Sequence, residues 1–170
     1  MAVCRYVVTT GDTRVLDELV PFLEGRLLNT EEESYYDLLG QTQETASLYE
    51  HCVRAILYGL RFGEHGLPLM GSGDWNDGMN LVGIEGKGES VWLGFFLYKV
   101  LESFAQLAQI KGDSVFTERC HEEAKKLKLN IAQHAWDGAW YLRAYFDDGS
   151  LLGSEQNTEC KIDSIAQSWP

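Results

Sequence analysis

The chain has 170 residues, 45% of them apolar, and its 26 acidic and 14 basic side chains give a net charge of −12. That length and apolar content suffice for one buried core, while the negative charge repels phosphate backbones and anionic lipid surfaces. We therefore expect one domain or part of one, with neither nucleic acid nor a membrane surface as a direct partner. Four scattered cysteines without metal-ligand spacing predict reduced thiols and a cytoplasmic location.

The first 62 residues predict helices on either side of a loop. Residues 1–10 (MAVCRYVVTT) resemble a helix already under way. Residues 12–23 predict a helix that Asp12 caps, with one apolar face. The polar stretch 25–43, which includes the acidic run 31–33, is expected to be a surface loop. Apolar spacings of three and four then predict a helix over 44–62, and Ser47 with Glu50 forms a capping box at its start.

The rest of the chain predicts a long loop, two helices and one β-hairpin, so the fold class is mainly α. Residues 63–88 are rich in glycine, and long ordered loops are usually functional. Residues 89–110 predict a helix that is apolar on more than one side. Asp113 caps a further helix with an apolar stripe, namely Phe116, Cys120, Ala124, Leu127 and Ile131. Alternation around Asp148-Gly149 predicts a hairpin near 140–153, and the tail 155–170 begins another helix. Both ends look abrupt, so we expect a segment of a longer chain.

The decapeptide GSGDWNDGMN (71–80) concentrates acids, amides and a tryptophan in the long loop. The spacing of Asp74, Asn76, Asn80 and Glu85 is that of a calcium loop, but glycine and methionine occupy its fifth and sixth positions, so we predict no metal. The segment GIEGKG (83–88) lacks the Ser or Thr that a phosphate loop needs after its lysine. The four histidines have no evident nucleophilic partner and are interpreted as surface or packing residues, namely His51, His65, His121 and His134.

What remains is carboxylate chemistry beside an aromatic ring. A poorly solvated site next to a tryptophan disfavours the ionised form of a carboxylic acid, raises its pKa and lets it deliver a proton near neutral pH. The ring also offers a flat apolar face to a sugar, and Asn and Asp can bind hydroxyls. The motif equally permits a structural role, in which Asp74, Asn76 and Asp77 cap a helix and form turns.

Longer stretches carry a family resemblance. The segment from GLPLM (66–70) to DGMN (77–80) and the segment GKGESVWL (86–93) closely resemble the inverting glycoside phosphorylases, the family of cellobiose and chitobiose phosphorylases. Further stretches resemble that family in the same order: TGD (10–12), VPFLEG (20–25), ASLYEHC (46–52), RAYFDDG (143–149) and ECKIDSIAQSW (159–169). The likeness covers the whole chain and is nearest to the C-terminal phosphorylase-like domain of cyclic β-1,2-glucan synthetases.

The resemblance implies that residues 1–170 are part of an (α/α)6-barrel catalytic domain. It implies that Asp77 is the general acid, that Trp75 lies against the sugar in the −1 subsite, and that Asp74 and Asn76 support or bind the sugar. The loop would be shaped by its glycines, Gly71, Gly73 and Gly78. Inorganic phosphate would be the co-substrate with no further cofactor, because phosphate is a ready nucleophile and one carboxylic acid then suffices.

The resemblance further implies a β-linked glucan oligosaccharide or glucose 1-phosphate as partner. The location would be the bacterial cytoplasm, or the cytoplasmic part of an inner-membrane synthetase. The family's sugar-holding Arg/Asp pair and its phosphate-holding His and Thr-Gly elements have no counterparts here, so we expect an incomplete site and self-association through uncovered apolar faces. Two alternatives stay open. One is an α/α-barrel hydrolase that activates water with Glu89 or Glu159, and the other is a non-catalytic glucan-binding or structural segment.

Overall fold

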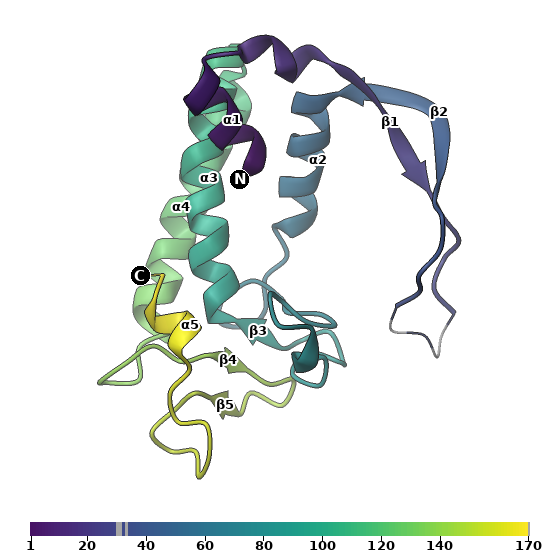
Figure 1. The fold of residues 1–170 in the computed structure, drawn as a ribbon. Coiled ribbons are helices and arrows are strands. Elements are labelled where there is room, and N and C mark those ends of the chain that lie inside the picture. The colour runs from purple at the N-terminus through teal and green to yellow at the C-terminus, as the bar shows by residue number, and fades with distance from the viewer. Residues whose placement is uncertain (30–31, 33, 170) are drawn as a thin grey trace. The chain divides into compact units, whose positions relative to one another are not determined.

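The computed structural model describes residues 1–29, 32 and 34–169, which divide into two compact units (Figure 1). Ala2–Tyr58 form one unit, and the chain from Gly59 onward forms the other. Helices supply most of the regular structure, and the strands form small antiparallel sheets. The fold is therefore mainly α, as predicted.

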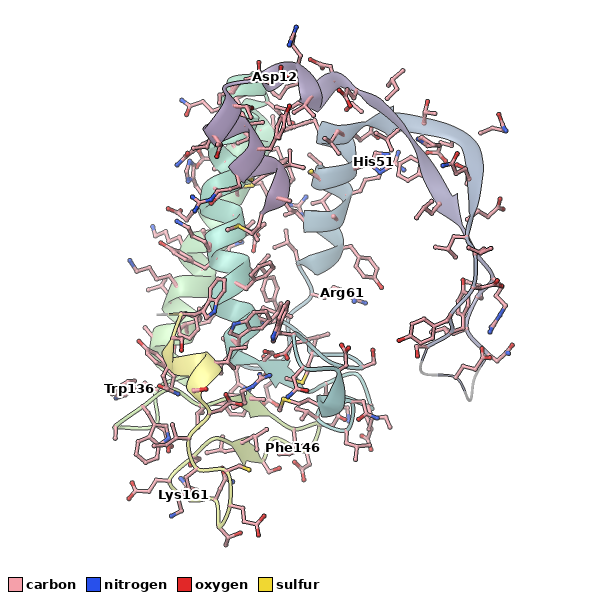
Figure 2. All side chains as sticks on the ribbon, viewed as in Figure 1. Asp12, His51, Arg61, Trp136, Phe146 and Lys161 are labelled. Atoms are coloured by element: carbon pink, nitrogen blue, oxygen red, sulfur yellow. The ribbon has the colours of Figure 1, made fainter. Side chains whose placement is uncertain are left out.

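The unit Ala2–Tyr58 consists of two helices and an antiparallel ribbon. In chain order its elements are α1 (Ala2–Thr10), the 3-10 turn η1 (Thr13–Asp17), β1 (Leu19–Glu24), β2 (Gly40–Ser47) and α2 (Leu48–Gly59). Figure 2 shows His51 on α2, on the side that faces β1. Its Nε2 lies 2.9 Å from the Val20 carbonyl oxygen, and its ring centroid is 4.1 Å from that of Phe22. These contacts hold the first strand against α2.

The predicted helix over 12–23 is wrong. Asp12 does cap a turn, by accepting a hydrogen bond from the Arg14 backbone N–H, but this turn is 3-10 and ends at Asp17. Pro21 lies in β1, where a two-stranded ribbon tolerates a residue without an N–H to donate. The partner strand lies about 20 residues further along, so local spacing could not reveal the pairing.

The surface loop predicted over 25–43 is confirmed only in part. Residues 25–29, 32 and 34–39 have no regular secondary structure, but β2 already begins at Gly40. Positions 31 and 33 of the acidic run lie outside the described residues. Because β2 also occupies 44–47, the helix predicted over 44–62 is shorter and begins at Leu48. The Ser47 hydroxyl still accepts a hydrogen bond from the Glu50 N–H at 3.2 Å, which is one of the two bonds of the predicted capping box.

The second unit is organised by a pair of long helices. α3 (Val91–Lys111) and α4 (Ser114–His134) lie side by side, and Gly112 ends the first with a φ of 75°. Ser90 and Asp113 cap their N-termini by accepting bonds from backbone N–H groups. The predicted apolar stripe of α4 is buried throughout, at Phe116, Cys120, Ala124, Leu127 and Ile131. Both helix predictions are confirmed, and the burial agrees with an apolar seam between the two helices.

A three-stranded antiparallel sheet covers the end of this pair where α3 begins and α4 finishes (Figure 1). Its strands are β3 (Glu89–Ser90), β4 (Ala144–Tyr145) and β5 (Leu151–Leu152), in the order β3-β4-β5. The predicted hairpin around Asp148-Gly149 is confirmed, with shorter strands and with β3 as an unpredicted third strand. The tail contains a short helix, α5 (Ser164–Gln167), as predicted.

The four cysteines are free thiols, in agreement with the sequence prediction. Burial raises the pKa of the Cys4 thiol and, together with the nearby Cys4, that of Cys52. None of the helices in the described part of the chain has the length and apolar content needed to span a bilayer.

Candidate active site

The loop that contains residues 71–80 is fixed to the three-stranded sheet at two places. Met70, at its start, is buried in an apolar cluster with Ala144 of β4. Asp147, in the β4–β5 hairpin, accepts hydrogen bonds at 2.8 Å from three backbone N–H groups of the segment 85–88. Desolvation raises the pKa of Asp147, but these three bonds outweigh it and the net shift is downward. The carboxylate therefore stays charged and ties the far end of the loop to the hairpin.

Asp74 is the buried acid of the motif and is paired with Arg143. Nη1 and Nη2 of Arg143 each donate a 2.7 Å hydrogen bond to one carboxylate oxygen, and the two side chains are 0% and 1% exposed. The Ser90 hydroxyl donates to Oδ2 at 2.5 Å, and the Asn76 N–H donates to Oδ1 at 3.1 Å. Burial raises the pKa of Asp74, but the bonds from Arg143 and Ser90 outweigh it and lower the pKa. Both carboxylate oxygens of Asp74 are thus engaged, and the cation beside it is a guanidinium.

Arg143 is held through its backbone as well as its side chain. Its N–H donates to the Leu152 carbonyl at 2.8 Å, and its carbonyl accepts from the Val91 N–H, the first residue of α3, at 3.2 Å. Its Nε lies 3.2 Å from Oδ2 of Asp163. The other oxygen of Asp163 caps α5 by accepting from the Ile165 N–H at 2.9 Å. One buried side chain therefore connects the 71–80 loop, the sheet and α5.

The three residues that follow Asp74 are exposed. Asp77 is the first residue of the 3-10 turn η2 (Asp77–Met79) and is exposed, and its carboxylate makes no hydrogen bond or ion pair with any described residue. Asn76 caps this turn, because its Oδ1 accepts from the Gly78 N–H at 3.0 Å. Trp75 is 73% exposed. Asp77 is therefore not buried against Trp75 in this chain, because Asp74 alone is anchored in the interior.

A polar pocket of about 410 Å³ opens beside Asp77. Besides the motif segment 75–78, its walls are Arg143, Asp163 and Ile165. The pocket therefore joins the free carboxylate of Asp77 to a guanidinium and a second carboxylate that already have partners.

A second, apolar pocket of about 590 Å³ is also bordered by Trp75. The rings that line it are Trp75, Trp92, Phe96 and Trp169. Trp92 stacks on Phe96 with centroids 5.5 Å apart and meets Trp169 edge-on at 5.8 Å. Because Trp75 borders both pockets, polar and apolar surfaces meet at this residue, and together they are complementary to a sugar with polar edges and an apolar face.

The glycines of the motif differ in what they contribute. Gly71 and Gly73 have positive φ angles of 61° and 146°. A Cβ on Gly73 would also lie 3.2 Å from the Asn76 carbonyl oxygen, so this position needs glycine for both conformation and space. Gly78 has no positive φ, and a Cβ there would lie 3.2 Å from Oδ1 of Asn76.

The carboxylates predicted for a water-activating role lie elsewhere. Glu89 is buried and accepts hydrogen bonds from the backbone N–H groups of His65 and Leu67 and from the His65 ring. Adjacent residues of a strand face opposite sides, so Glu89 points away from the side on which Ser90 meets the motif. Glu159 is exposed and does not line the pocket beside Asp77.

The histidines are surface or packing residues, as predicted. The His51 ring lies tilted against Phe22, and His65 stacks on Tyr145 with centroids 3.8 Å apart. His134 meets the His65 ring edge-on, and His121 is exposed on α4.

Three residues of the site were not predicted from the sequence. Ser90 and Asp163 each precede a helix and could have been recognised as caps. Arg143 lies 69 residues from Asp74, and no local pattern joins them. Its only signal was a charged side chain within an otherwise apolar strand pattern.

The sequence of the chain is similar to those of known proteins. Residues 1–170 match the catalytic domain of the glycosyl hydrolase 94 superfamily. The chain is 43% identical over 169 residues to the cyclic beta-(1,2)-glucan synthase NdvB of Rhizobium meliloti (strain 1021), a match that covers 99% of this chain and 6% of that protein. It is 35% identical over 166 residues to the solabiose phosphorylase of Paenibacillus borealis, with 96% and 19% covered.

A third relative is the N,N'-diacetylchitobiose phosphorylase of Vibrio proteolyticus, 29% identical over 163 residues, with 94% of this chain and 18% of that protein covered. The chain thus spans between 6% and 19% of the length of these three relatives.

Proposed function

The chain belongs to the glycosyl hydrolase 94 superfamily, as part of its catalytic domain, and on this premise we propose that it carries the proton-donating part of an inverting glycoside phosphorylase site. The observation that carries the proposal is Asp77, a carboxylate at a polar pocket with no partner among the described residues, two residues after an exposed tryptophan. Relatives named as phosphorylases and as a glucan synthase support a carbohydrate-active protein.

In the proposed reaction a sugar lies against Trp75, and Asp77 donates its proton to the glycosidic oxygen. A phosphate oxygen attacks the anomeric carbon from the opposite face, the bond to the protonated oxygen breaks, and the configuration inverts. Phosphate is already nucleophilic, so a single carboxylic acid suffices. In reverse, Asp77 accepts the proton of an acceptor hydroxyl while phosphate leaves glucose 1-phosphate. A sugar seated on Trp75 also excludes water from the otherwise exposed Asp77.

The proposed substrate is a β-linked glucan, or glucose 1-phosphate in the synthetic direction. The name of the relative that is 43% identical, a cyclic beta-(1,2)-glucan synthase, favours β-1,2 linkages. The proposed fold of the complete catalytic domain is an (α/α)6 barrel, in which the α3–α4 pair would be one helical repeat. This is consistent with the mainly α structure and with a chain that covers a small share of each relative.

The experiment replaces Asp77 by Asn in the full-length protein and measures glucose 1-phosphate released from β-1,2-glucan oligosaccharides. We expect activity to fall at least about 100-fold, the low end of what a general acid contributes. The matched control is Glu122→Gln, which removes an exposed carboxylate from α4. Retention of most activity in the Asp77 variant, with wild-type folding, would reject the assignment.

A water-using hydrolase is the second candidate, because Asp163 places another carboxylate in the wall of the pocket beside Asp77. It replaces Glu89 and Glu159 as the residue to consider for activating water. Product analysis separates the two reactions: phosphate-dependent release of glucose 1-phosphate supports phosphorolysis, and phosphate-independent release of free glucose supports hydrolysis.

A further inference from the structure

We propose that Arg143 is a positioning residue for Asp77, which it holds at the pocket through Asp74. The inference rests on the proposed function, because it assigns a role to Arg143 in the delivery of the Asp77 proton.

The first step is the rigidity of the contact between Arg143 and Asp74. The two side chains form a fork with two parallel bonds of 2.7 Å, and both are almost completely buried. A planar guanidinium fixes both the distance and the orientation of a carboxylate, which a single point contact cannot do. Arg143 is in turn held by its backbone bonds to Leu152 and Val91.

The second step follows the chain from Asp74 to Asp77, three residues later. Oδ1 of Asp74 accepts the Asn76 N–H, and the Asn76 side chain in turn caps the turn that Asp77 begins. The same guanidinium nitrogen that binds Oδ1 lies 3.0 Å from the sulfur of Met79, the last residue of that turn. Arg143 therefore contacts both ends of the 74–79 segment, and the exposed Asp77 lies between the two held points.

The third step concerns Asp163, another residue that lines the pocket. Arg143 Nε lies 3.2 Å from the Asp163 carboxylate, which caps α5. One guanidinium thus contacts both Asp163, a second carboxylate of the pocket lining, and the segment that carries Asp77. Its charge is directed at Asp74 and Asp163, so its effect on Asp77 is geometric. Misplacing a catalytic group by about 1 Å can cost about 100-fold in rate.

The test uses Arg143→Lys and Asp74→Asn in the full-length protein. The lysine keeps the charge and loses the fork, and the asparagine keeps the shape and loses the charge. We expect kcat for phosphorolysis to fall about 100-fold in each variant, while KM for phosphate and for the oligosaccharide changes less than about threefold. The control is Asp113→Ala, which removes the cap of α4 at the end of α3 remote from Ser90 and should leave kcat within about threefold.

The decisive measurement adds Arg143→Lys to Asp77→Asn. If Arg143 acts through Asp77, the residual kcat of the double variant stays within about threefold of that of Asp77→Asn alone. A further loss of about 100-fold would mean that Arg143 acts independently of Asp77, and the proposal would fail.

The failures of the two proposals are distinguishable. Wild-type protein without phosphate-dependent turnover, or an active Asp77→Asn variant, rejects the phosphorylase assignment. An inactive Asp77→Asn variant together with an Arg143→Lys variant of normal kcat, or of raised KM alone, rejects only the positioning role. Should Arg143→Lys not fold, Asp74→Asn alone and combined with Asp77→Asn gives the same comparison, because it breaks the same contact from the other side.

Discussion

Removing Glu89 should destabilise the 63–70 segment far more than it slows the reaction. The carboxylate is 2% exposed and accepts the backbone N–H groups of His65 and Leu67. In Glu89→Ala both groups lose their acceptor, and at about 1–3 kcal/mol for each unsatisfied donor we expect a local loss of about 4 kcal/mol. Glu89→Gln keeps an acceptor oxygen and loses the charge, so we expect about 1.5 kcal/mol, the low end for a bond to a charged group.

Amide hydrogen exchange of the full-length protein measures these changes locally, since it does not require the whole chain to unfold as one unit. A loss of about 4 kcal/mol corresponds to about a thousandfold drop in protection of the Leu67 amide, and 1.5 kcal/mol to about tenfold. Phosphorolysis at 25 °C is measured on the same samples and should stay within about threefold in Glu89→Gln. Unchanged protection combined with lost activity in both variants would refute this reasoning and make Glu89 a catalytic group.

Three further outcomes follow from the contacts described. The pKa of Asp74 is lower in the folded state than its ordinary value of 3.8. The ionised carboxylate therefore contributes its full stabilisation above that value and loses it as the pH falls through the folded pKa. In Asp74→Asn we expect the free energy of unfolding, measured by circular dichroism, to depend less on pH below about pH 4 than in the wild type. Gly153→Ala should lower the free energy of unfolding by at least about 2 kcal/mol, because the new Cβ would lie 2.7 Å from the Arg143 backbone nitrogen. Gly149→Ala has a similar φ and open space around the new Cβ, so we expect a loss of about 1 kcal/mol, and thermal unfolding measures both variants. Among the four thiols, the exposed Cys160 should react first with a thiol reagent under native conditions, as peptide mapping of the label would show.

The parts of the fold that follow from local pattern were predicted, and those that need a distant partner were not. The α4 stripe was correct residue by residue, because a helix buries side chains at a period that the sequence itself carries. The segment around Leu19 and Pro21 was assigned to a helix because its apolar spacing also suits one. This segment forms a strand because it pairs with residues 40–47, and a pattern of neighbouring residues in the sequence cannot show that pairing.

The candidate site divides in the same way. Cap chemistry is local, so the possible turn-forming role of Asn76 could be stated from the sequence, and its bond to the Gly78 N–H is present. The spacing of the residues could not show that Asp74 is buried and paired while Asp77 is exposed, because both are acids in one short loop. It depends on where Arg143 lies, 69 residues further along. Only the family resemblance distinguished the two acids beforehand.

The arrangement of charges beside Asp77 bears on which reaction the site can support. Water must be deprotonated to attack, so a hydrolase needs a second carboxylate with free lone pairs across the sugar. The carboxylate available in this pocket is Asp163, yet one of its oxygens accepts the Ile165 N–H and the other lies 3.2 Å from the Arg143 guanidinium. Both oxygens of Asp163 therefore already have a partner among the described residues, whereas a water-activating carboxylate needs an oxygen free to take the proton of water. Among the described residues of this pocket, the Asp77 carboxylate has no partner and both oxygens of Asp163 are engaged, an arrangement that suits a nucleophile that arrives already charged, as phosphate does.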